Sequence, residues 1–151
     1  MPLERPGAVL FACTLNRVRS PMAERLMKLM FGQSVYVDSC GLRRDDEGAP
    51  DPFLVTVMNE MGLDLSRHQP KTFDELDDDA FDLVISLSPE AQHRAVELSR
   101  RRAIALEYWP TFDPTLAMGS RETVLGAYRD VRDGLAAHIR ERFGRPATFG
   151  G

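Results

Sequence analysis

The stretch AVLFACTLNRVRSPMAERL, residues 8–26, passes from an apolar run through a short polar loop into a segment of helical period. The loop begins at Cys13 and reaches Arg19 and Ser20 after five intervening residues, and Pro21 is expected to start the helix. A loop between a strand and a helix N-terminus can turn several backbone N–H groups toward one small volume, where the helix dipole also favours an anion. The stretch therefore predicts an anion-binding loop built around a cysteine.

Cys13 is either a small core residue or a nucleophile. The converging N–H groups and the guanidinium of Arg19 would favour the thiolate, and a planar guanidinium fork matches two phosphate oxygens. Ser20 can hydrogen-bond the sulfur, and Asn16 suits a tight loop because it tolerates a left-handed backbone and can tie neighbouring turns together. The strand before the loop and the Ser-Pro pair after it favour the nucleophile.

The rest of the chain alternates short apolar runs with segments of helical period. The runs are mostly continuous, which is typical of parallel strands covered by helices on both faces. The sequence predicts the α/β class: a single-domain, doubly wound, four-stranded parallel sheet, with the anion-binding loop after the first strand. Residues 1–151 are expected to form one domain with a frayed tail from about residue 144. The expected strands are residues 8–12, 35–39, 81–87 and 103–109.

Composition excludes several functions. The chain is 43% hydrophobic with a net charge of −4, so it has no general basic field for nucleic acid. It has no apolar membrane span or signal peptide, and we expect a cytoplasmic protein. The two cysteines and three scattered histidines lack the spacing of a four-ligand zinc site, and the acidic run at 74–82 lacks the spacing of a calcium loop. We expect no metal and no cofactor.

The segment VLFACTLNRVRSPMAE resembles the opening of the low-molecular-weight protein tyrosine phosphatases, a family that includes thioredoxin-coupled arsenate reductases. VYVDSC is similar to the family's D-S-A-G segment, GLDLSRH to its G-I-x-x-S-x-H segment, and FDLVISLSPE to its third strand and following helix. The resemblance covers about residues 8–143. The Asp-Pro pair of YWPTFDPT puts Asp113 at the place of the family's general acid, in a loop at the same edge of the sheet as Cys13.

The resemblance implies an enzyme, a cysteine-dependent phosphatase that hydrolyses phosphomonoesters. Cys13 would attack phosphorus, Arg19 and the loop amides would hold the phosphate oxygens, and Asp113 would protonate the leaving oxygen. Water would then hydrolyse the phosphocysteine. Ser39 and His68 match positions in the family's hydrogen-bond network behind the loop. The remaining substrate-binding positions are Thr14, Leu15, Asn16, Arg17, Val18 and Ser20.

Several residues depart from the family pattern. Leu15 stands where the family usually has glycine, so the loop must accept a side chain there. Val18 replaces the second loop cysteine of many eukaryotic members, which excludes a disulfide within the loop. We also consider Cys40, after Ser39 at the end of the second strand, as a resolving thiol for an oxidised Cys13. The aromatic residues that flank phosphotyrosine in the family are not evident here, where the sequence has Arg43, Arg44, Thr115 and Leu116.

Two alternatives to the phosphatase remain. Arsenate has the shape and charge of phosphate, so Cys13 could serve an arsenate reductase that uses an external thiol or Cys40; the thioredoxin-coupled route needs two cysteines that SLSPEAQHRAVELSRRR lacks. A non-catalytic module that binds phosphate or a phosphoprotein is the other, although Asp113 argues against it. The expected partners are a phosphorylated protein or small phosphomonoester and inorganic phosphate or other oxyanions, with neither nucleic acid nor membrane.

Overall fold

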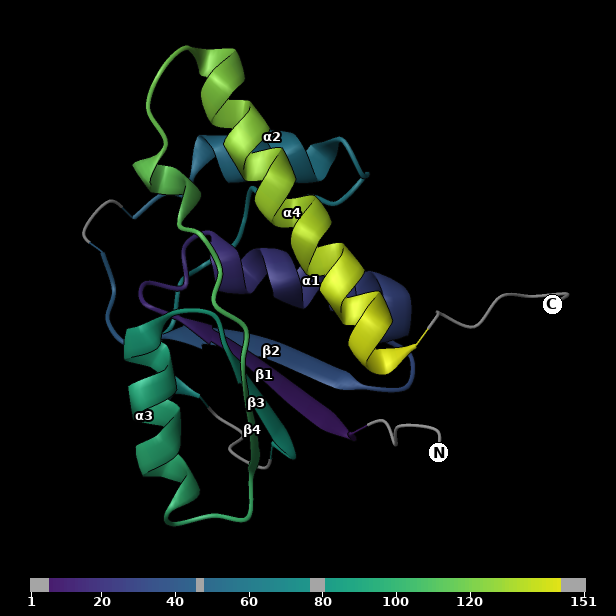
Figure 1. The fold of residues 1–151 in the computed structure, drawn as a ribbon, viewed down its shortest axis with the longest axis vertical. Coiled ribbons are helices and arrows are strands. Elements are labelled where there is room, and N and C mark those ends of the chain that lie inside the picture. The colour runs from purple at the N-terminus through teal and green to yellow at the C-terminus, as the bar shows by residue number, and fades with distance from the viewer. Residues whose placement is uncertain (1–5, 46–47, 77–80, 145–151) are drawn as a thin grey trace, which may run out of the picture.

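A computed structural model describes residues 6–45, 48–76 and 81–144. Four parallel strands form one sheet in the order β2-β1-β3-β4, with the first strand in the interior of the sheet (Figure 1). This confirms the predicted parallel sheet, and the ends of the strands fall within two residues of the predicted ones. The strands are β1 (Ala8–Cys13), β2 (Tyr36–Gly41), β3 (Leu83–Ser86) and β4 (Ala105–Tyr108).

Helices connect the strands and cover the sheet. The helices are α1 (Arg19–Phe31), α2 (Pro52–Asn59), α3 (Pro89–Ser99) and α4 (Arg121–Phe143), with short 3-10 turns η1 (Phe73–Glu75) and η2 (Pro114–Leu116). In the described residues, no helix combines the length and the apolar character needed to span a bilayer. Residues 77–80, inside the acidic run, and 145–151, in the expected frayed tail, lie outside the part of the chain that the structure describes.

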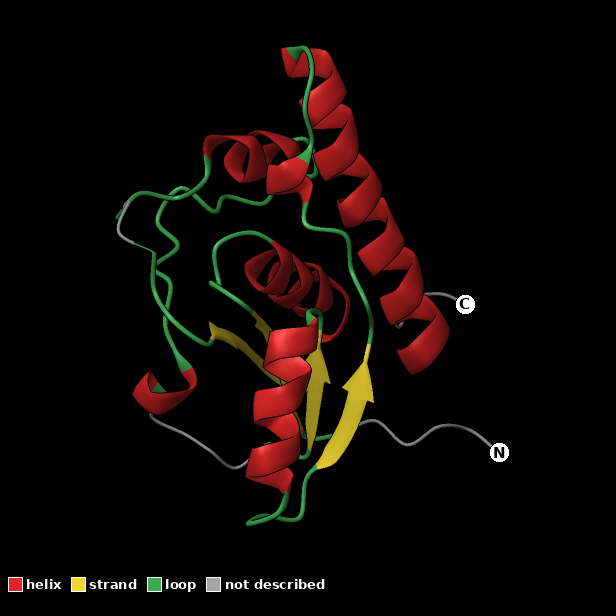
Figure 2. Ribbon diagram, turned by 60° about the vertical axis from the view of Figure 1, so that its left-hand side comes forward, coloured by secondary structure: helices red, strands yellow, loops and turns green. Residues whose placement is uncertain are grey.

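Side chains of β1 alternate between two apolar layers, because successive residues of a strand point to opposite faces. Val9, Phe11 and Cys13 belong to the larger layer, which α1 and α4 cover. Leu10 and Ala12 belong to the smaller layer, which α3 covers. Figure 2 shows α3 on one side of the sheet and α1 and α4 on the other. Helices on both faces are thus confirmed.

The helix N-termini follow from local sequence, with one correction. Ser88 caps α3 by accepting a hydrogen bond from the N–H of Ala91, and Pro89 takes the first helical position as expected. Pro21, however, does not start α1, because the helix begins two residues earlier at Arg19. Proline is tolerated there because the first four N–H groups of a helix have no intrahelical acceptor. Arg19 and Ser20 are therefore residues of the first helical turn.

A buried hydrogen bond fixes α4 to α2. Asp51 caps α2 by accepting from the N–H groups of Phe53 and Leu54, and its second carboxylate oxygen accepts from the hydroxyl of Tyr128 at 2.9 Å. Burial, followed by the adjacent charge of Asp51, raises the pKa of Tyr128, so its hydroxyl remains a donor. One carboxylate therefore satisfies the start of one helix and anchors another.

Tyr128→Phe should lower the free energy of unfolding by about 1–3 kcal/mol, because it leaves a buried carboxylate oxygen of Asp51 without its donor. Urea denaturation followed by circular dichroism measures the change. Tyr108→Phe is the matched control, since Tyr108 is exposed and its hydroxyl has no hydrogen bond among the described residues. Equal stabilities of Tyr128→Phe and the wild type would contradict the assignment.

Candidate active site

Cys13 ends β1 at the carboxyl edge of the sheet, where a pocket of about 690 Å³ opens. The side chain of Cys13 is buried, with 2% of its surface exposed, so only a small group that enters this pocket can reach the sulfur. Within the described residues, no group of three or more His, Cys, Asp or Glu side chains is placed to hold a metal ion. The pocket is lined by Cys13, Thr14, Leu15, Arg17, Val18, Arg19, Arg43, Asp45, Pro89, Glu90, Asp113, Thr115 and Leu116.

We call residues 13–19 the cradle loop. Two of its carbonyl groups accept hydrogen bonds from residues outside the loop. The carbonyl oxygen of Thr14 accepts hydrogen bonds from the N–H groups of Leu42 at 2.8 Å and Arg43 at 3.3 Å. The carbonyl oxygen of Asn16 lies 2.8 Å from Nε2 of His68, which must carry the proton because a carbonyl only accepts.

These carbonyl contacts orient the amides of the cradle loop. The described peptide bonds are trans, so each N–H points opposite to the carbonyl of the same peptide unit. The N–H of Leu15 therefore points away from Leu42, and the N–H of Arg17 points away from His68. In the described residues, the N–H groups of Thr14, Leu15, Asn16 and Val18 donate to no protein acceptor. Together with the N-terminus of α1, they can bind a tetrahedral anion.

Asn16 is the centre of the hydrogen-bond network that holds the cradle loop. It is fully buried and has a φ of 56°, the left-handed conformation expected from the sequence. Its Nδ2 donates to Oγ of Ser20 at 2.8 Å and Oγ of Ser39 at 2.9 Å, and its Oδ1 accepts from the N–H of Lys71 at 3.0 Å. The structure thus brings Asn16, Ser20, Ser39 and His68, the positions indicated by the family resemblance, into one hydrogen-bond network.

Ser20 connects this network to the sulfur. Its Oγ lies 2.9 Å from Sγ of Cys13. When the sulfur is ionised it only accepts hydrogen bonds, so the hydroxyl of Ser20 is then the donor. The same hydroxyl accepts from Asn16 at 2.8 Å, and the carbonyl oxygen of Cys40, at 3.4 Å, is a more distant acceptor for its proton than the sulfur. Ser20 is therefore placed to stabilise a thiolate at Cys13.

Arg19 and Asp113 lie side by side in the lining of the pocket. Nη1 of Arg19 donates to the carbonyl oxygen of Thr111 at 3.1 Å, and Nη2 lies 3.9 Å from Oδ2 of Asp113. The other carboxylate oxygen, Oδ1, accepts from both the N–H and the hydroxyl of Thr115. Oδ2 therefore remains available on the side that faces the pocket. The predicted nucleophile, arginine and acid all line the same pocket.

Known proteins resemble this chain over most of its length. A family model described as low molecular weight phosphotyrosine protein phosphatase matches residues 8–140. The chain belongs to this family. An arsenate reductase of Bacillus subtilis is 30% identical over 136 residues, which cover 88% of this chain and 92% of the relative. An arsenate reductase of Staphylococcus epidermidis is 32% identical over 134 residues, which cover 87% of this chain and 91% of the relative.

Solved structures agree with this assignment in fold. A mutant of YwlE from Bacillus subtilis has a TM-score of 0.73 at 23% identity, covering 89% of this chain and 94% of the neighbour. An arsenate reductase in its oxidized state has a TM-score of 0.71 at 25% identity, covering 91% of this chain and 96% of the neighbour. The sequence relatives named here are thus arsenate reductases, and the solved structures share the fold of this low molecular weight phosphatase-family chain.

The two departures within the cradle loop fit the fold. Asn16 is the only non-glycine residue with a positive φ in the described chain, so Leu15 has an ordinary backbone and takes its side chain without strain. Val18 is 4% exposed and packs in the larger apolar layer, where it precedes the first residue of α1. Arg17 forms an ion pair with Asp45, with Nε 3.2 Å from Oδ2, at the rim of the pocket.

Cys40 lies on the opposite face of the sheet from Cys13. Cys40 packs with Leu10 and Ala12 in the smaller apolar layer, whereas Cys13 faces the larger layer with Phe11. Side chains that point apart cannot form a disulfide without backbone movement. Burial, and then the neighbouring charge of Cys13, raises the pKa of Cys40, which keeps it a poorly reactive thiol. The structure therefore argues against the hypothesis that Cys40 resolves an oxidised Cys13.

The site contains two residues that the sequence analysis missed. Glu24 of α1 accepts from Oγ of Ser39 at 2.5 Å and so extends the network behind Asn16. Gly41 ends β2 against the cradle loop, where a Cβ atom would lie 2.7 Å from N of Asn16 and 2.7 Å from C of Leu15. The signals were available, because Glu24 closes the quoted RSPMAE segment and Gly41 directly follows VYVDSC.

Gly41→Ala should lower turnover of a phosphate ester by about 100-fold, because the added methyl group pushes the backbone of the cradle loop out of register with its anion. Steady-state kinetics with an aryl phosphate measures the loss, and circular dichroism verifies the fold. Gly126→Ala on α4 is the matched control, because nothing lies within 4 Å of its added Cβ. Unchanged kinetics in Gly41→Ala would show that the close approach does not shape the site.

Proposed function

We propose that this chain is a phosphomonoester hydrolase, of the protein tyrosine phosphatase type, that acts through a phosphocysteine on Cys13. One observation carries the proposal: the sulfur of Cys13 lies in the same pocket as unpaired loop amides, the Arg19 guanidinium and the Asp113 carboxyl group. The amides and Arg19 supply the donors that a phosphoryl group needs, and the sulfur supplies the nucleophile. A module that only binds phosphate does not protonate a leaving group, so it does not need the carboxyl group of Asp113.

The first step transfers the phosphoryl group to sulfur. The thiolate of Cys13 attacks phosphorus and forms the S–P bond while the bond from phosphorus to the ester oxygen breaks. Asp113 delivers its proton to that oxygen through the available Oδ2. The loop amides and Arg19 stabilise the charge on the three equatorial oxygens, and the hydroxyl of Ser20 stabilises the sulfur before and after the transfer.

The second step releases phosphate. Asp113, now ionised, takes a proton from a water molecule that attacks phosphorus from the side the leaving group has vacated. The P–O bond forms as the S–P bond breaks, and the electron pair returns to Cys13 as thiolate. The products are inorganic phosphate and the free alcohol or phenol. No cofactor enters this balance.

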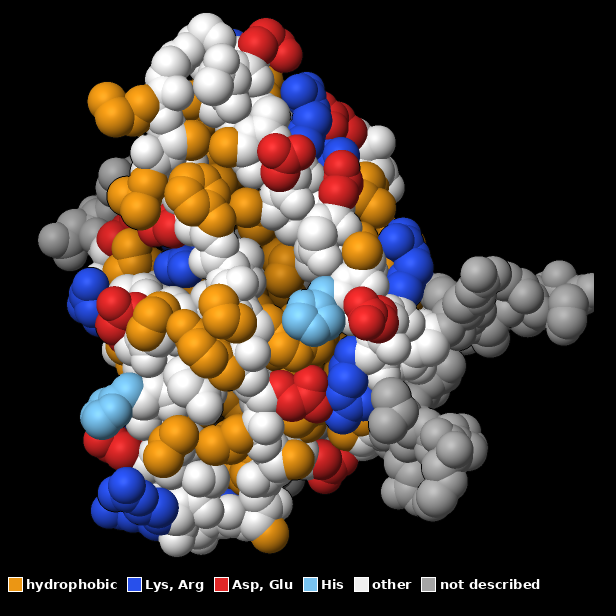
Figure 3. Space-filling view, in the orientation of Figure 1, with side chains coloured by type: hydrophobic (Ala, Val, Ile, Leu, Met, Phe, Trp, Pro, Cys, Tyr) orange, Lys and Arg blue, Asp and Glu red, His pale blue; other side chains and the backbone are white. Residues whose placement is uncertain are grey.

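The described rim of the pocket lacks the features that would hold the phenyl ring of a phosphotyrosine between aromatic side chains. None of the described residues that line the pocket is aromatic, and Leu15, Val18, Pro89 and Leu116 are among its apolar lining residues. Phe112, Leu116 and Met118 are exposed on the connection from β4 to α4, where Figure 3 shows apolar side chains gathered on the surface. The substrate we propose is a phosphorylated protein or a small phosphomonoester in the cytoplasm, where both free cysteines stay reduced.

Cys13→Ser should abolish hydrolysis of an aryl phosphate while retaining phosphate binding, and Asp113→Asn should slow turnover by roughly 10²- to 10⁴-fold, the usual contribution of a general acid. Release of the phenol measures turnover, and calorimetry measures phosphate binding. Asp130→Asn is the matched control because Asp130 is an exposed carboxylate of α4 outside this pocket. Wild-type turnover by Cys13→Ser would refute the mechanism, and absence of turnover in the wild type would leave a binding module.

A second candidate function is arsenate reduction, which the arsenate reductase relatives at 30% and 32% identity favour. Cys13 would displace water from arsenate and form an S–As(V) bond. A thiolate from a small external thiol such as glutathione would attack the Cys13 sulfur, the S–As electron pair would leave with arsenic as arsenite, and a second thiol would reduce the mixed disulfide. The two thiols supply the two electrons and become one disulfide.

If the chain reduces arsenate, Cys13→Ser should abolish arsenite formation with glutathione, and Cys40→Ser should leave its rate unchanged because Cys40 faces the other side of the sheet. Arsenite is measured against time for the wild type and both variants, with thioredoxin in place of glutathione as a further arm. Loss of reduction in Cys40→Ser would contradict the assignment of the external thiol. No arsenite from the wild type would remove this second candidate.

A further inference from the structure

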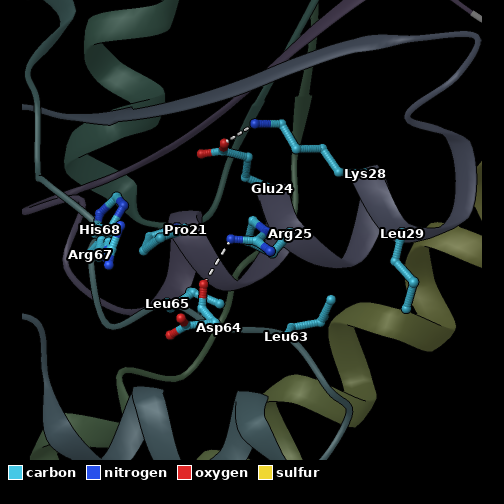
Figure 4. Close-up of a pocket in the computed structure, with 10 residues that line it drawn as sticks. All are labelled: Pro21, Glu24, Arg25, Lys28, Leu29, Leu63, Asp64, Leu65, Arg67 and His68. Atoms are coloured by element: carbon cyan, nitrogen blue, oxygen red, sulfur yellow. Dashed lines mark hydrogen bonds and ion pairs between the residues drawn. The ribbon is translucent and has the colours of Figure 1, made fainter.

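A second hollow, the α1 groove, lies behind the cradle loop and outside the active-site pocket. It has a volume of about 510 Å³ and runs between one face of α1, residues 21–29, and the segment after α2, residues 63–68 (Figure 4). Pro21 and His68 line the groove. Pro21 follows Ser20 in the first turn of α1, and His68 is hydrogen-bonded to Asn16 of the cradle loop. The groove therefore adjoins the cradle loop through His68.

Part of the α1 groove is apolar. Pro21, Leu63 and Leu65 are buried along it, whereas Leu29 has 56% of its surface exposed. An exposed leucine beside a hollow lined by buried apolar side chains offers a surface that a short hydrocarbon chain can cover. A ligand of this groove should therefore have an apolar part.

The charged side chains of the groove favour an anion. Arg25, Lys28 and Arg67 carry permanent positive charges, whereas the two carboxylates, Glu24 and Asp64, are already engaged. Glu24 accepts from Lys28 and Ser39. The carboxylate of Asp64 accepts from Ser66, whose side chain and N–H lower the pKa of Asp64.

The two arginines retain donors for a ligand. Nη1 of Arg25 donates to the backbone carbonyl of Asp64 at 3.0 Å, a contact drawn in Figure 4. Neither Arg25 nor Arg67 has a carboxylate hydrogen bond among the described residues. Arginine presents five N–H groups in a planar fork, so most of the donors in this groove remain for an incoming carboxylate or phosphate.

Two routes made of three hydrogen bonds connect the α1 groove to the anion cradle. His68, at one end of the groove, donates from Nε2 to the carbonyl of Asn16 at 2.8 Å. Glu24, at its side, accepts from Ser39, which in turn accepts from Nδ2 of Asn16. A ligand in the groove therefore lies beside His68 and Glu24, which take part in the hydrogen bonds that position Asn16.

We propose that the α1 groove binds a small organic anion with an apolar tail, and that its occupancy is coupled to oxyanion binding in the cradle. The anionic group contacts Arg25 and Arg67, and the tail covers Leu29 and Leu63. The coupling passes through His68 to Asn16 and is reciprocal, so phosphate in the cradle changes the affinity of the groove by the same factor. The coupling rests on the proposed function of the cradle, whereas binding in the groove does not.

Binding is tested on the full chain with octanoate as the probe, in saturating inorganic phosphate so that the cradle is occupied. Octanoate should bind in a saturable manner by calorimetry, and the neutral octanamide should bind about tenfold more weakly because it lacks the charge. Arg25→Gln and Arg67→Gln should each weaken octanoate about fivefold or more, since each removes one charge-assisted contact. Arg140→Gln, on the exposed face of α4 outside the groove, is the matched control.

Absence of saturable binding, equal affinities for octanoate and octanamide, or a loss in Arg140→Gln equal to that in the groove variants would overturn the site. Coupling is tested by measuring the affinity for inorganic phosphate with and without octanoate, where a change of about fivefold or more is expected. His68→Ala should remove that change while octanoate still binds. Both experiments measure binding, so a wild-type protein that does not hydrolyse phosphate esters would still show whether the groove binds octanoate.

Discussion

The conformation of the cradle loop depends on the hydrogen bonds that two of its carbonyl groups, those of Thr14 and Asn16, accept from the rest of the protein. The carbonyl of Thr14 is bound by the turn after β2, and the carbonyl of Asn16 by His68, so the N–H groups of the same peptide units must face the other way. An anion cradle follows from contacts made entirely on its outer side. This explains why residues distant in sequence, such as Gly41 and His68, matter for a loop that itself spans seven residues from Cys13 to Arg19.

The fold was largely predictable because its signals are local. The continuous apolar runs predict the strands. The Ser-Pro pair predicts where α3 begins, because serine caps a helix N-terminus. The start of α1 was wrong by two residues, since proline is tolerated anywhere in the first helical turn and its position alone does not mark the first residue. Motif and spacing predicted the residues of the cradle loop, whose pocket also contains Asp113.

Contacts across the sheet could not be predicted in the same way. Gly41 lies just beyond the predicted strand at 35–39; its place after VYVDSC is visible in the sequence, but the 2.7 Å approach that gives it its role exists only in the folded chain. Cys40 looked close to Cys13 because both lie at the same edge, but the alternation of side chains along a strand places them on opposite faces. Two residues at the same edge of a sheet can therefore react with each other only if their side chains also point to the same face of the sheet.

Arg19 joins two parts of the molecule that act on the same substrate in the mechanism we propose. Its Nη1 holds the carbonyl of Thr111 while Nη2 faces Asp113, so the rigid plane of one guanidinium sets the spacing between α1 and the segment that carries the acid. A lysine at this position would keep the positive charge but lose the fixed separation of two donors. The carboxyl group of Asp113 would then no longer be held at one position relative to the bond that breaks, and protonation of the leaving oxygen would no longer coincide with cleavage of that bond.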